Sequence, residues 1–433
     1  MKLWDKAGTS TAEQVELFTV GNDRVFDAML APYDVQGNKA QAHMLQDMGI
    51  ITPQENEQLQ QALDEISIQV TQPGFALPQG VEDIHSYVEF LLTEKVGEAG
   101  KKIHTGRSRN DQVALDIKLY LRAQIKEIAT GVQQTFNVLL QQAEAYKHCL
   151  MPGYTHLQLA MPSSAGLWLS AYAESLVDDI EMLKAAYAIV NKNPLGSGAG
   201  YGSAFRLNRQ LTTQLLGFDT LNVNSMYAQM TRGKAEKAVA TAMGYVAATL
   251  SRLAYDACLY LNQNFGFISF PDELTTGSSI MPHKKNPDVF ELIRAKCNRI
   301  QALPNELTLL INNLPGGYHR DMQLTKEMLF PAIEELKACL RMMVLMMENL
   351  QVKPNILDDE RYKYLFTVDA MNELVNQGMP YREAYRQVGN AVNSGSFSYQ
   401  PGQLNHVHMG SIGNLGLAQI AAAMQAAIQP ILP

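Results

Sequence analysis

The middle of the chain carries four long stripes of apolar residues at helical spacing. These residues recur every three or four positions over 117–136, 169–190, 239–260 and 333–350. Such spacing places one apolar seam along each helix, close to the repeat of about 3.5 residues found in helical bundles. The alternation of apolar and polar residues that is typical of strands is scarce. The pattern therefore predicts a mainly α-helical protein whose core is a bundle of long helices.

Shorter patterns lie on either side of this core. Helical spacing covers 38–49 and 54–70 near the start, and it shortens again after Pro354. The segment 391–415 is rich in Ser, Asn, Gly and His, which indicates a loop. The run RMMVLMM at 341–347 is apolar on more than one face, which is typical of a helix buried on several sides or of a Met-lined ligand groove. We expect an N-terminal helical domain at 1–111, a central long-helix bundle at 112–360 and a small C-terminal helical domain at 361–433.

Length and composition exclude several classes of protein. The chain has 433 residues, of which 46% are hydrophobic and 18% charged, so it has enough apolar surface for a large folded core. The longest apolar stretch, at 242–250, is nine residues long and too short to cross a bilayer. The start, MKLWDKAGTS, lacks the apolar centre of a signal peptide, so we expect a cytoplasmic protein.

Charge and cysteine content narrow the range of partners. The formal net charge is −8 and there is no basic block, which argues against nucleic acid or an anionic membrane as a partner. The four cysteines lie far apart and form no metal-ligand motif, so we expect reduced thiols and neither disulfides nor a metal site. These cysteines are Cys149, Cys258, Cys297 and Cys339.

Candidate chemistry gathers in four polar segments, of which HTGRSRNDQ at 104–112 is the first. Its arginines and Asn110 have the groups to hold a dicarboxylate, because a guanidinium pairs with a carboxylate through two hydrogen bonds. The alternatives are structural. Asn110 and Asp111 could cap a helix that starts near Val113, or the segment could be a surface loop.

The second segment is PGYTHLQ at 152–158, between two of the apolar stripes. His156 stands next to Thr155, and a histidine can act as an acid or a base near neutral pH. A histidine in a loop is also often structural or exposed to solvent. The residue pattern alone leaves both interpretations open.

The third segment is GSSIMPHKKNPDVFE at 277–291. Its Gly-Ser-Ser start is rich in backbone N–H and hydroxyl groups, and Lys284 and Asn286 supply a cation and an amide two residues apart. A loop of this kind can bind an anion and stabilise negative charge that grows on it. Pro287 favours the start of a helix after the loop. A chance combination of these groups is the alternative.

The fourth segment is YHRDMQLTK at 318–326. On one helix, Tyr318, Gln323 and Lys326 would share at most a broad face, because their spacing corresponds to about 80° beyond two full turns. The structural alternative is the solvated start of a helix. Spacing alone does not decide between a binding surface and this alternative.

Together the four segments resemble the motifs of a known enzyme family. HTGRSRNDQV, MPGYTHLQ and GSSIMPHKKNPD are similar to the three signature regions of the fumarase/aspartase superfamily, and HTGRSRND with YHRDMQLTK resembles the argininosuccinate lyases. The resemblance runs from about Val35 to Gly389. It implies a homotetramer with a core of twenty long helices and with active sites shared between subunits. It also implies reversible cleavage of argininosuccinate to arginine and fumarate, in arginine biosynthesis, without a metal or organic cofactor.

The resemblance implies catalytic roles for five residues. Ser278 would take a proton from the substrate carbon, and its alkoxide would need support from loop amides and positive charge. Lys284 and Asn286 would stabilise the charge that moves onto the neighbouring carboxylate. His156 would protonate the leaving nitrogen or hold the network around it, in a charge-relay-like pair with Glu291.

The resemblance also implies the residues that bind the substrate. The succinyl carboxylates would contact Arg109, Asn110 and Thr155. The arginine part would contact Tyr318, Gln323 and Lys326, with Lys326 on its α-carboxylate. Asp83 and His85, in the string EDIHS, and Arg232, which is retained from an otherwise acidic family string, would lie behind these groups.

Several positions depart from the family pattern. The usual start LWGGRF is replaced by Leu-Trp-Asp-Lys at 3–6, and Leu159 and Met161 stand where Arg and Gln are common. Gly233 replaces an acidic residue. A serine that the family carries near the string FTVGND has no clear counterpart, although Asp23 is close to the expected place.

Two other functions remain as alternatives to argininosuccinate cleavage. A sister lyase of the adenylosuccinate or aspartate type would release fumarate from another substrate, but the sequence contains no dedicated site for a nucleotide phosphate beyond the shared loops. A non-enzymatic structural protein on the same fold, like some lens crystallins, would tolerate the loss of Ser278 or His156, and both residues are present.

Overall fold

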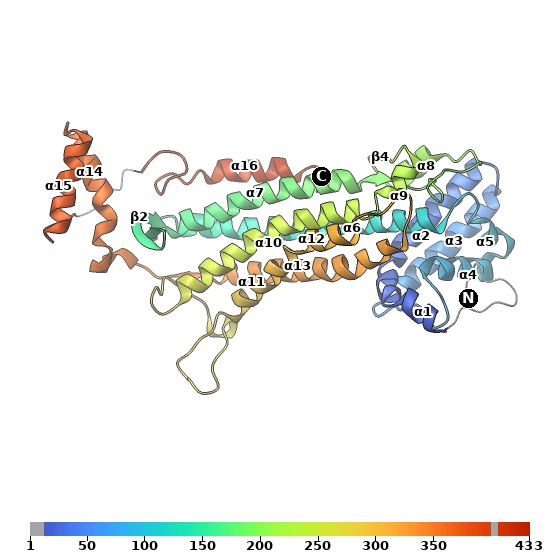
Figure 1. Cartoon of the computed structure of the whole chain (residues 1–433), viewed down its shortest axis with the longest axis horizontal. Helices are drawn as coiled ribbons and strands as arrows, with labels where there is room; N and C mark the ends of the chain where they lie inside the picture. Colours follow the sequence, from blue (N-terminus) through green and yellow to red (C-terminus); the bar gives the residue numbers. More distant parts are fainter. Residues whose placement is uncertain (1–12, 400–405) are drawn as a thin grey trace. The chain divides into compact units, whose positions relative to one another are not determined.

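The computed structural model of the chain describes residues 13–399 and 406–433, so the unusual start at 3–6 lies outside the described residues. The described part is mainly α-helical, and its strands form three two-stranded sheets (Figure 1). The predicted fold class and the low sheet content are therefore confirmed. Within these residues, no helix combines the length and the apolar character needed to cross a membrane.

Four long helices coincide with the four apolar stripes. The stripes mark their buried sides, where residues such as Ile125, Leu176, Leu250 and Leu336 are fully buried. Three of the four methionines in the run at 341–347 are buried, as expected for a helix that is covered on several sides. The long helices are α6 (Arg109–Ala145), α7 (Ala165–Val190), α10 (Lys234–Leu261) and α13 (Leu324–Glu348).

The chain divides into two compact units, and each long helix contributes a segment to both. Within the described residues, the first unit contains the chain up to Ile128, Met182–Gly244 and Ile300–Glu335. The second unit contains Ala129–Glu181, Tyr245–Arg299 and Leu336–Pro433. Each unit is thus assembled from three separate stretches, whereas the three expected domains are continuous. The expected boundaries at 111 and 360 stay a prediction.

The first unit adds shorter helices to its segments of the long ones. The expected helix at 38–49 proves to be the second half of a longer helix, α2, which continues through Pro32 because its buried face is continuous. The additional elements are α1 (Glu13–Val20), α2 (Asp23–Asp47), α3 (Pro53–Val70), α4 (Ile84–Val96), α5 (Glu98–Lys102), α8 (Arg209–Leu215), α9 (Ser225–Met230), α12 (Leu303–Leu310), the 3₁₀ turn η2 (Arg320–Gln323) and the parallel strands β3 (Lys192–Asn193) and β4 (Thr220–Leu221).

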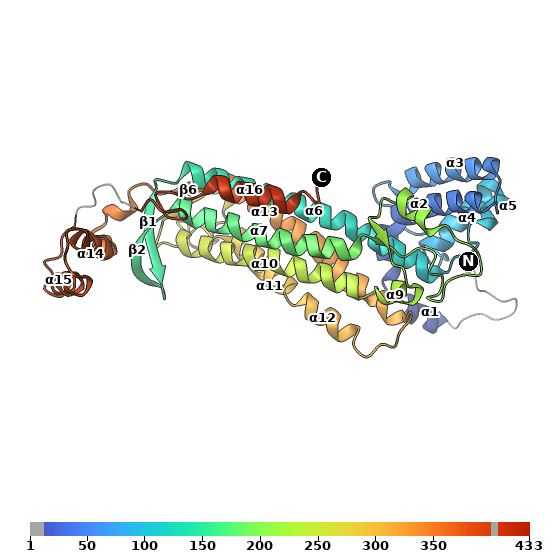
Figure 2. The same cartoon turned by 90° about the horizontal axis from the view of Figure 1, so that it is seen from above.

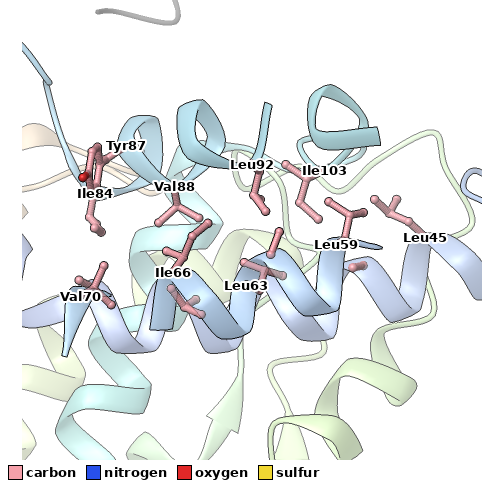
Figure 3. Packing of buried hydrophobic residues seen from close by; sticks show 14 of the residues in the cluster. Leu45, Leu59, Leu63, Ile66, Val70, Ile84, Tyr87, Val88, Leu92 and Ile103 are labelled. Atoms are coloured by element: carbon pink, nitrogen blue, oxygen red, sulfur yellow. The ribbon is translucent and has the colours of Figure 1, made fainter. Parts of the chain in front are cut away.

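An apolar core joins α2, α3 and α4 in this unit. Leu63 of α3 packs in the same buried cluster as Val88 and Leu92 of α4 (Figure 3). Full burial of such a side chain contributes about 1.5–3 kcal/mol. The start of α3 is fixed by a capping box, in which the Thr52 hydroxyl accepts a hydrogen bond from the Glu55 N–H and the Glu55 carboxylate accepts one from the Thr52 N–H. This core is the support on which α2 and α4 present their polar residues.

The second unit contains a β-hairpin and a group of C-terminal helices (Figure 2). Outside 400–405, the expected loop at 391–415 contains only the end of a helix, turns and one isolated bridge. All four cysteines are free thiols, as expected. The additional elements are β1 (Leu150–Thr155) and β2 (Gln158–Ser164), β5 (Ile268–Ser269) and β6 (Gln351–Val352), η1 (Asp272–Leu274), α11 (Asp288–Ile300), η3 (Ile356–Asp358), η4 (Glu360–Phe366), α14 (Thr367–Asn376), α15 (Tyr381–Asn393) and α16 (Leu417–Ile428).

Candidate functional site

Eight of the predicted site residues line one cavity of about 230 Å³ in the first unit. They come from segments that are far apart in the sequence, and the cavity has polar walls. The eight are Asp83, His85, Arg109, Asn110, Arg232, Tyr318, Gln323 and Lys326. Six further residues complete the lining and were not among the predicted ones: Val20, Asp23, Asp27, Glu82, Val113 and Arg320.

Arg109 enters the cavity from the first residue of α6. Its guanidinium pairs with Asp83 and donates a hydrogen bond to the Ser86 hydroxyl at 3.0 Å. Asp83 also caps α4, because its Oδ1 accepts a hydrogen bond from the Ser86 N–H at 2.8 Å. The arginine that was expected to hold a succinyl carboxylate is therefore paired with a carboxylate of its own chain.

The start of α6 differs from the expected cap near Val113. The helix begins at Arg109, so Asn110 lies in its first turn and does not cap it. Asp111 accepts hydrogen bonds from the N–H groups of Ser108, Gly196 and Gly198 at 2.9, 3.1 and 2.9 Å. These three bonds tie the helix start to the glycine-rich loop that follows β3. They leave the side chain of Asn110 free to face the cavity.

Lys326 lies among carboxylates of α2. Its ammonium is 2.6 Å from Asp23 Oδ1 and 2.8 Å from Asp27 Oδ1, and its side chain is only 3% exposed. Burial by itself would raise the pKa of Asp27, but Lys326, His85 and the N–H of Ile84 together outweigh burial and lower it. At Asp23 burial prevails over the attraction of Lys326, and the pKa is raised. Two carboxylates therefore share one ammonium at this end of the cavity.

His85 is buried beneath the cavity between two aspartates. Its Nδ1 is 2.8 Å from Asp34 Oδ1 and 3.6 Å from Asp116 Oδ2. Burial alone would lower the pKa of His85, but these carboxylates outweigh burial and raise it to about 9. The three groups lie within 4.8 Å of one another, a spacing that metal ligands can have. Because a doubly protonated imidazole has no free lone pair, we interpret them as an ion cluster in which the hydrogen bond joins His85 and Asp34.

Arg232 and Gln323 are held by other parts of the first unit. Arg232 donates to Glu236 Oε1 at 2.9 Å and to the carbonyl of Met322 at 3.0 Å, which ties the first turn of α10 to η2. Gln323 donates to the carbonyl of Thr19 at 2.9 Å. Arg232 lines the cavity, and its expected supporting role stays a prediction. Gln323 anchors the junction between α1 and α2, a role that the sequence does not indicate.

The remaining six predicted residues lie in the second unit, where Thr155 and His156 are at the exposed tip of the β1–β2 hairpin. Thr155 pairs with Gln158, and His156 and Leu157 form the two-residue turn with φ of 54° and 56°. Such a turn matches the twist of a hairpin, but its left-handed conformation costs a residue other than glycine about 1–2 kcal/mol. The segment expected as a loop is therefore a hairpin, and His156 stands at its strained tip.

Ser278 lies in a loop that a short bridge closes at its base. The Asn286 N–H donates to the carbonyl of Thr276 at 2.8 Å, and Asn286 Nδ2 donates to the carbonyl of Gly277 at 3.3 Å. The hydroxyl oxygen of Ser278 accepts hydrogen bonds from the N–H groups of Ile280 at 3.4 Å and Met281 at 3.2 Å. Two backbone amides are thus directed at this oxygen, which is an arrangement that can stabilise negative charge on it.

Lys284 and Glu291 are exposed in this unit. Within the described residues, the Lys284 ammonium forms no ion pair, and His156 and Glu291 do not pair with each other inside one chain. The helix that carries Glu291, α11, begins directly after Pro287, as expected. The predicted pair between His156 and Glu291 stays a prediction.

Comparison with known proteins places the chain in a family. A profile of the family described as "Lyase" matches residues 8–302. Proteins named argininosuccinate lyase are 54% identical in Bacteroides fragilis, over 99% of this chain and 95% of the relative, and 55% identical in Bacteroides thetaiotaomicron, over 98% and 95%. One from Xanthomonas oryzae pv. oryzae is 38% identical over 90% of this chain and 91% of the relative.

Solved structures agree at the level of the fold. A structure of EDDS lyase in complex with formate superposes with a TM-score of 0.77 and 23% identity, covering 98% of this chain and 91% of the other. A fumarate lyase:delta crystallin from Brucella melitensis bound to cobalt gives a TM-score of 0.74 with 17% identity, over 94% and 91%. The fold is thus shared with these structures, and the matches in sequence place the chain among the fumarate-releasing lyases. Within that class, the chain belongs to the argininosuccinate lyase family.

Proposed function

We propose that this protein cleaves argininosuccinate reversibly into L-arginine and fumarate, as a step of arginine biosynthesis. The observation that carries the proposal is the identity of 54% over 99% of the chain with a protein named argininosuccinate lyase. The polar cavity of the first unit supports it, because this cavity contains both basic and acidic groups. A substrate with carboxylates, an ammonium group and a guanidinium needs both kinds of partner.

The reaction removes a proton from the carbon beside a succinyl carboxylate and breaks the bond to a guanidinium nitrogen. In our proposal Ser278 takes the proton, supported by the amides of Ile280 and Met281. Lys284 and Asn286 stabilise the charge that moves onto the carboxylate, and each tenfold in rate requires about 1.4 kcal/mol of such stabilisation. His156 gives a proton to the leaving nitrogen or holds the network that does so.

We further propose that substrate binding is divided among the remaining groups. Thr155, Arg109 and Asn110 hold the succinyl carboxylates, which requires Arg109 to share its guanidinium with Asp83 or to exchange partners. Tyr318, Gln323 and Lys326 hold the arginine part. Asp83, His85 and Arg232 support them from behind.

The site residues of the second unit lie largely at the surface of the chain, which motivates a proposal about assembly. We propose a cytoplasmic homotetramer, in which each active site collects 104–112, 152–158 and 277–291 from three different subunits. Thr155, His156 and Lys284 are exposed in one chain, and groups that must surround a small substrate need other surfaces to exclude water. Contact between subunits would also bring His156 within reach of Glu291.

Parallel incubation of the purified protein with argininosuccinate, adenylosuccinate, malate and aspartate tests the proposed function. We expect fumarate to form from argininosuccinate and not from adenylosuccinate, and arginine to appear in equal amount. Fumarate from adenylosuccinate alone, or from aspartate alone, would assign the protein to a sister lyase. No fumarate from any of these compounds would favour a structural role.

A further inference from the structure

The end of the cavity around Lys326 carries more negative than positive charge. Asp23 and Asp27 stand one turn apart on α2, and both carboxylates contact the single ammonium of Lys326. The next cation, Arg232, is bonded to Glu236 at 2.9 Å, so it adds no excess positive charge. Asp23, Asp27 and Glu236 thus outnumber the two cations Lys326 and Arg232 with which they are associated.

Lys326, Asp27 and Asp23 differ in how many of their hydrogen-bonding positions are occupied. The ammonium of Lys326 has three hydrogens; it donates one to Asp27 Oδ1 at 2.8 Å and lies 2.6 Å from Asp23 Oδ1, so it retains a donor for a ligand carboxylate. Asp27 is occupied at both oxygens, because its Oδ2 also accepts from the N–H of Ile84 at 3.4 Å. Asp23 Oδ1 is buried and accepts no hydrogen bond from the described residues, although the Lys326 ammonium lies 2.6 Å away, and Asp23 lines the cavity. Asp23 is thus the acceptor that remains available.

This inference rests on the proposed function, which places the amino-acid end of the substrate beside Lys326. We propose that Asp23 binds the α-ammonium group of the arginine part while Lys326 binds its α-carboxylate. The two side chains together then recognise the complete α-amino acid head group. Asp23 stands near the place where the resemblance predicts a serine. A carboxylate binds an ammonium group more strongly than a hydroxyl does, because both partners of the hydrogen bond are charged.

Three inhibitors that differ at the head group test this proposal in the intact enzyme. L-arginine carries both charged groups, 5-guanidinopentanoate lacks the ammonium, and agmatine lacks the carboxylate. Their affinities are measured by calorimetry and by inhibition of fumarate release. We expect the parent protein to bind L-arginine at least about tenfold more tightly than 5-guanidinopentanoate, as one charge-assisted hydrogen bond allows.

The decisive variants are Asp23→Asn, which keeps the shape of the side chain, and Asp23→Ser. In both, the preference for L-arginine over 5-guanidinopentanoate should fall about fivefold or more, while the preference for L-arginine over agmatine should change less than twofold. Asp64→Asn, which removes an exposed carboxylate on α3, is the matched control and should change neither ratio.

Two outcomes would overturn the proposal. If both Asp23 variants keep the parent's discrimination against 5-guanidinopentanoate, the ammonium binds elsewhere. If both variants weaken the binding of all three inhibitors equally, Asp23 shapes the pocket and does not bind the ammonium group. A parent protein that releases fumarate from argininosuccinate yet binds L-arginine and 5-guanidinopentanoate equally would refute this inference alone. A parent that releases no fumarate and binds none of the three would refute the proposed function.

Discussion

The two groups of site residues differ in how completely a single chain satisfies them. In the first unit, the cations Arg109 and Lys326 are paired with carboxylates, and Lys326 is buried with its partners. In the second unit, Lys284 is exposed and forms no ion pair within the described residues, and His156 stands at the tip of an exposed hairpin. A charge buried inside one chain is costly unless a group of the same chain pairs with it. An exposed charge is solvated by water and can be paired later by another surface. The first unit therefore contains a preformed pocket, whereas the second unit presents exposed groups whose surroundings must be completed by contact with another subunit.

The largest expected effect comes from removing one lysine from each group. Lys326→Met leaves two carboxylates of α2 without their cation, so we expect the free energy of unfolding to fall by about 3–5 kcal/mol. Lys284→Met removes an exposed charge and should leave stability unchanged while it lowers turnover. Urea unfolding of both variants at one protein concentration gives the comparison. Equal losses of stability would remove the distinction between the two groups.

The exposed residues of the second unit should affect the rate of the chemical step more than substrate binding. If Ser278 is the base, Ser278→Ala should lower kcat at least about 100-fold and leave substrate affinity largely intact, because the binding residues of the cavity remain. Ser279→Ala, at the exposed neighbouring position, is the control and should be close to the parent. Steady-state release of fumarate is the readout. Near-normal turnover of Ser278→Ala would move the base to another residue.

The ion cluster of the first unit should make its stability depend on pH. Because the folded chain raises the pKa of His85 from 6.5 to about 9, the protonated form stabilises the fold. This contribution is fully present below pH 6.5 and is lost as the pH rises toward 9, which corresponds to roughly 1–3 kcal/mol of unfolding free energy.

Urea unfolding at pH 6.5 and pH 9 measures this dependence. His85→Gln should remove the fall in stability between these two pH values, because glutamine does not titrate. His43→Gln, which changes an exposed histidine on α2, should retain the dependence of the parent. The same slope in His85→Gln as in the parent would mean that another group titrates.

The smallest effect concerns the strained hairpin tip. Leu157 is 67% exposed and has a φ of 56°, so Leu157→Gly removes strain and little packing. We expect a gain of about 0.5–1 kcal/mol, since glycine adopts this conformation without penalty but loses more chain entropy. Leu159→Gly, two residues along in β2, should instead destabilise the hairpin. Denaturation midpoints of the two variants should therefore move in opposite directions.

How far the sequence predicts this molecule depends on whether a signal is local. The long helices could be predicted because each stripe repeats over several turns. The hairpin could not, because its turn residues, His156 and Leu157, lack the glycine or asparagine that usually marks such a turn. The ion pair between Asp27 and Lys326 could not be predicted either. The two residues are 299 positions apart, and only tertiary packing brings them together.

Much of the candidate site followed from the family resemblance and not from spacing. Tyr318, Gln323 and Lys326 share at most a broad face on an ideal helix, yet all three line one cavity. They do so because a 3₁₀ turn, η2, precedes α13 and changes their relative directions. Ion pairing between Arg109 and Asp83 could not be predicted for the same reason as the Lys326 pairs, because it depends on packing between separate helices.

The most direct test of the account asks whether the exposed group is completed by other subunits. Ser278→Ala and His156→Ala, each inactive alone, are refolded together in equal amounts. If the two residues meet from different subunits of a randomly assembled symmetric oligomer, each site has about one chance in four of receiving both intact residues. We therefore expect the co-refolded protein to recover up to roughly a quarter of the parental activity. Hybrids that contain both variants by mass, yet show no activity above either variant alone, would contradict it.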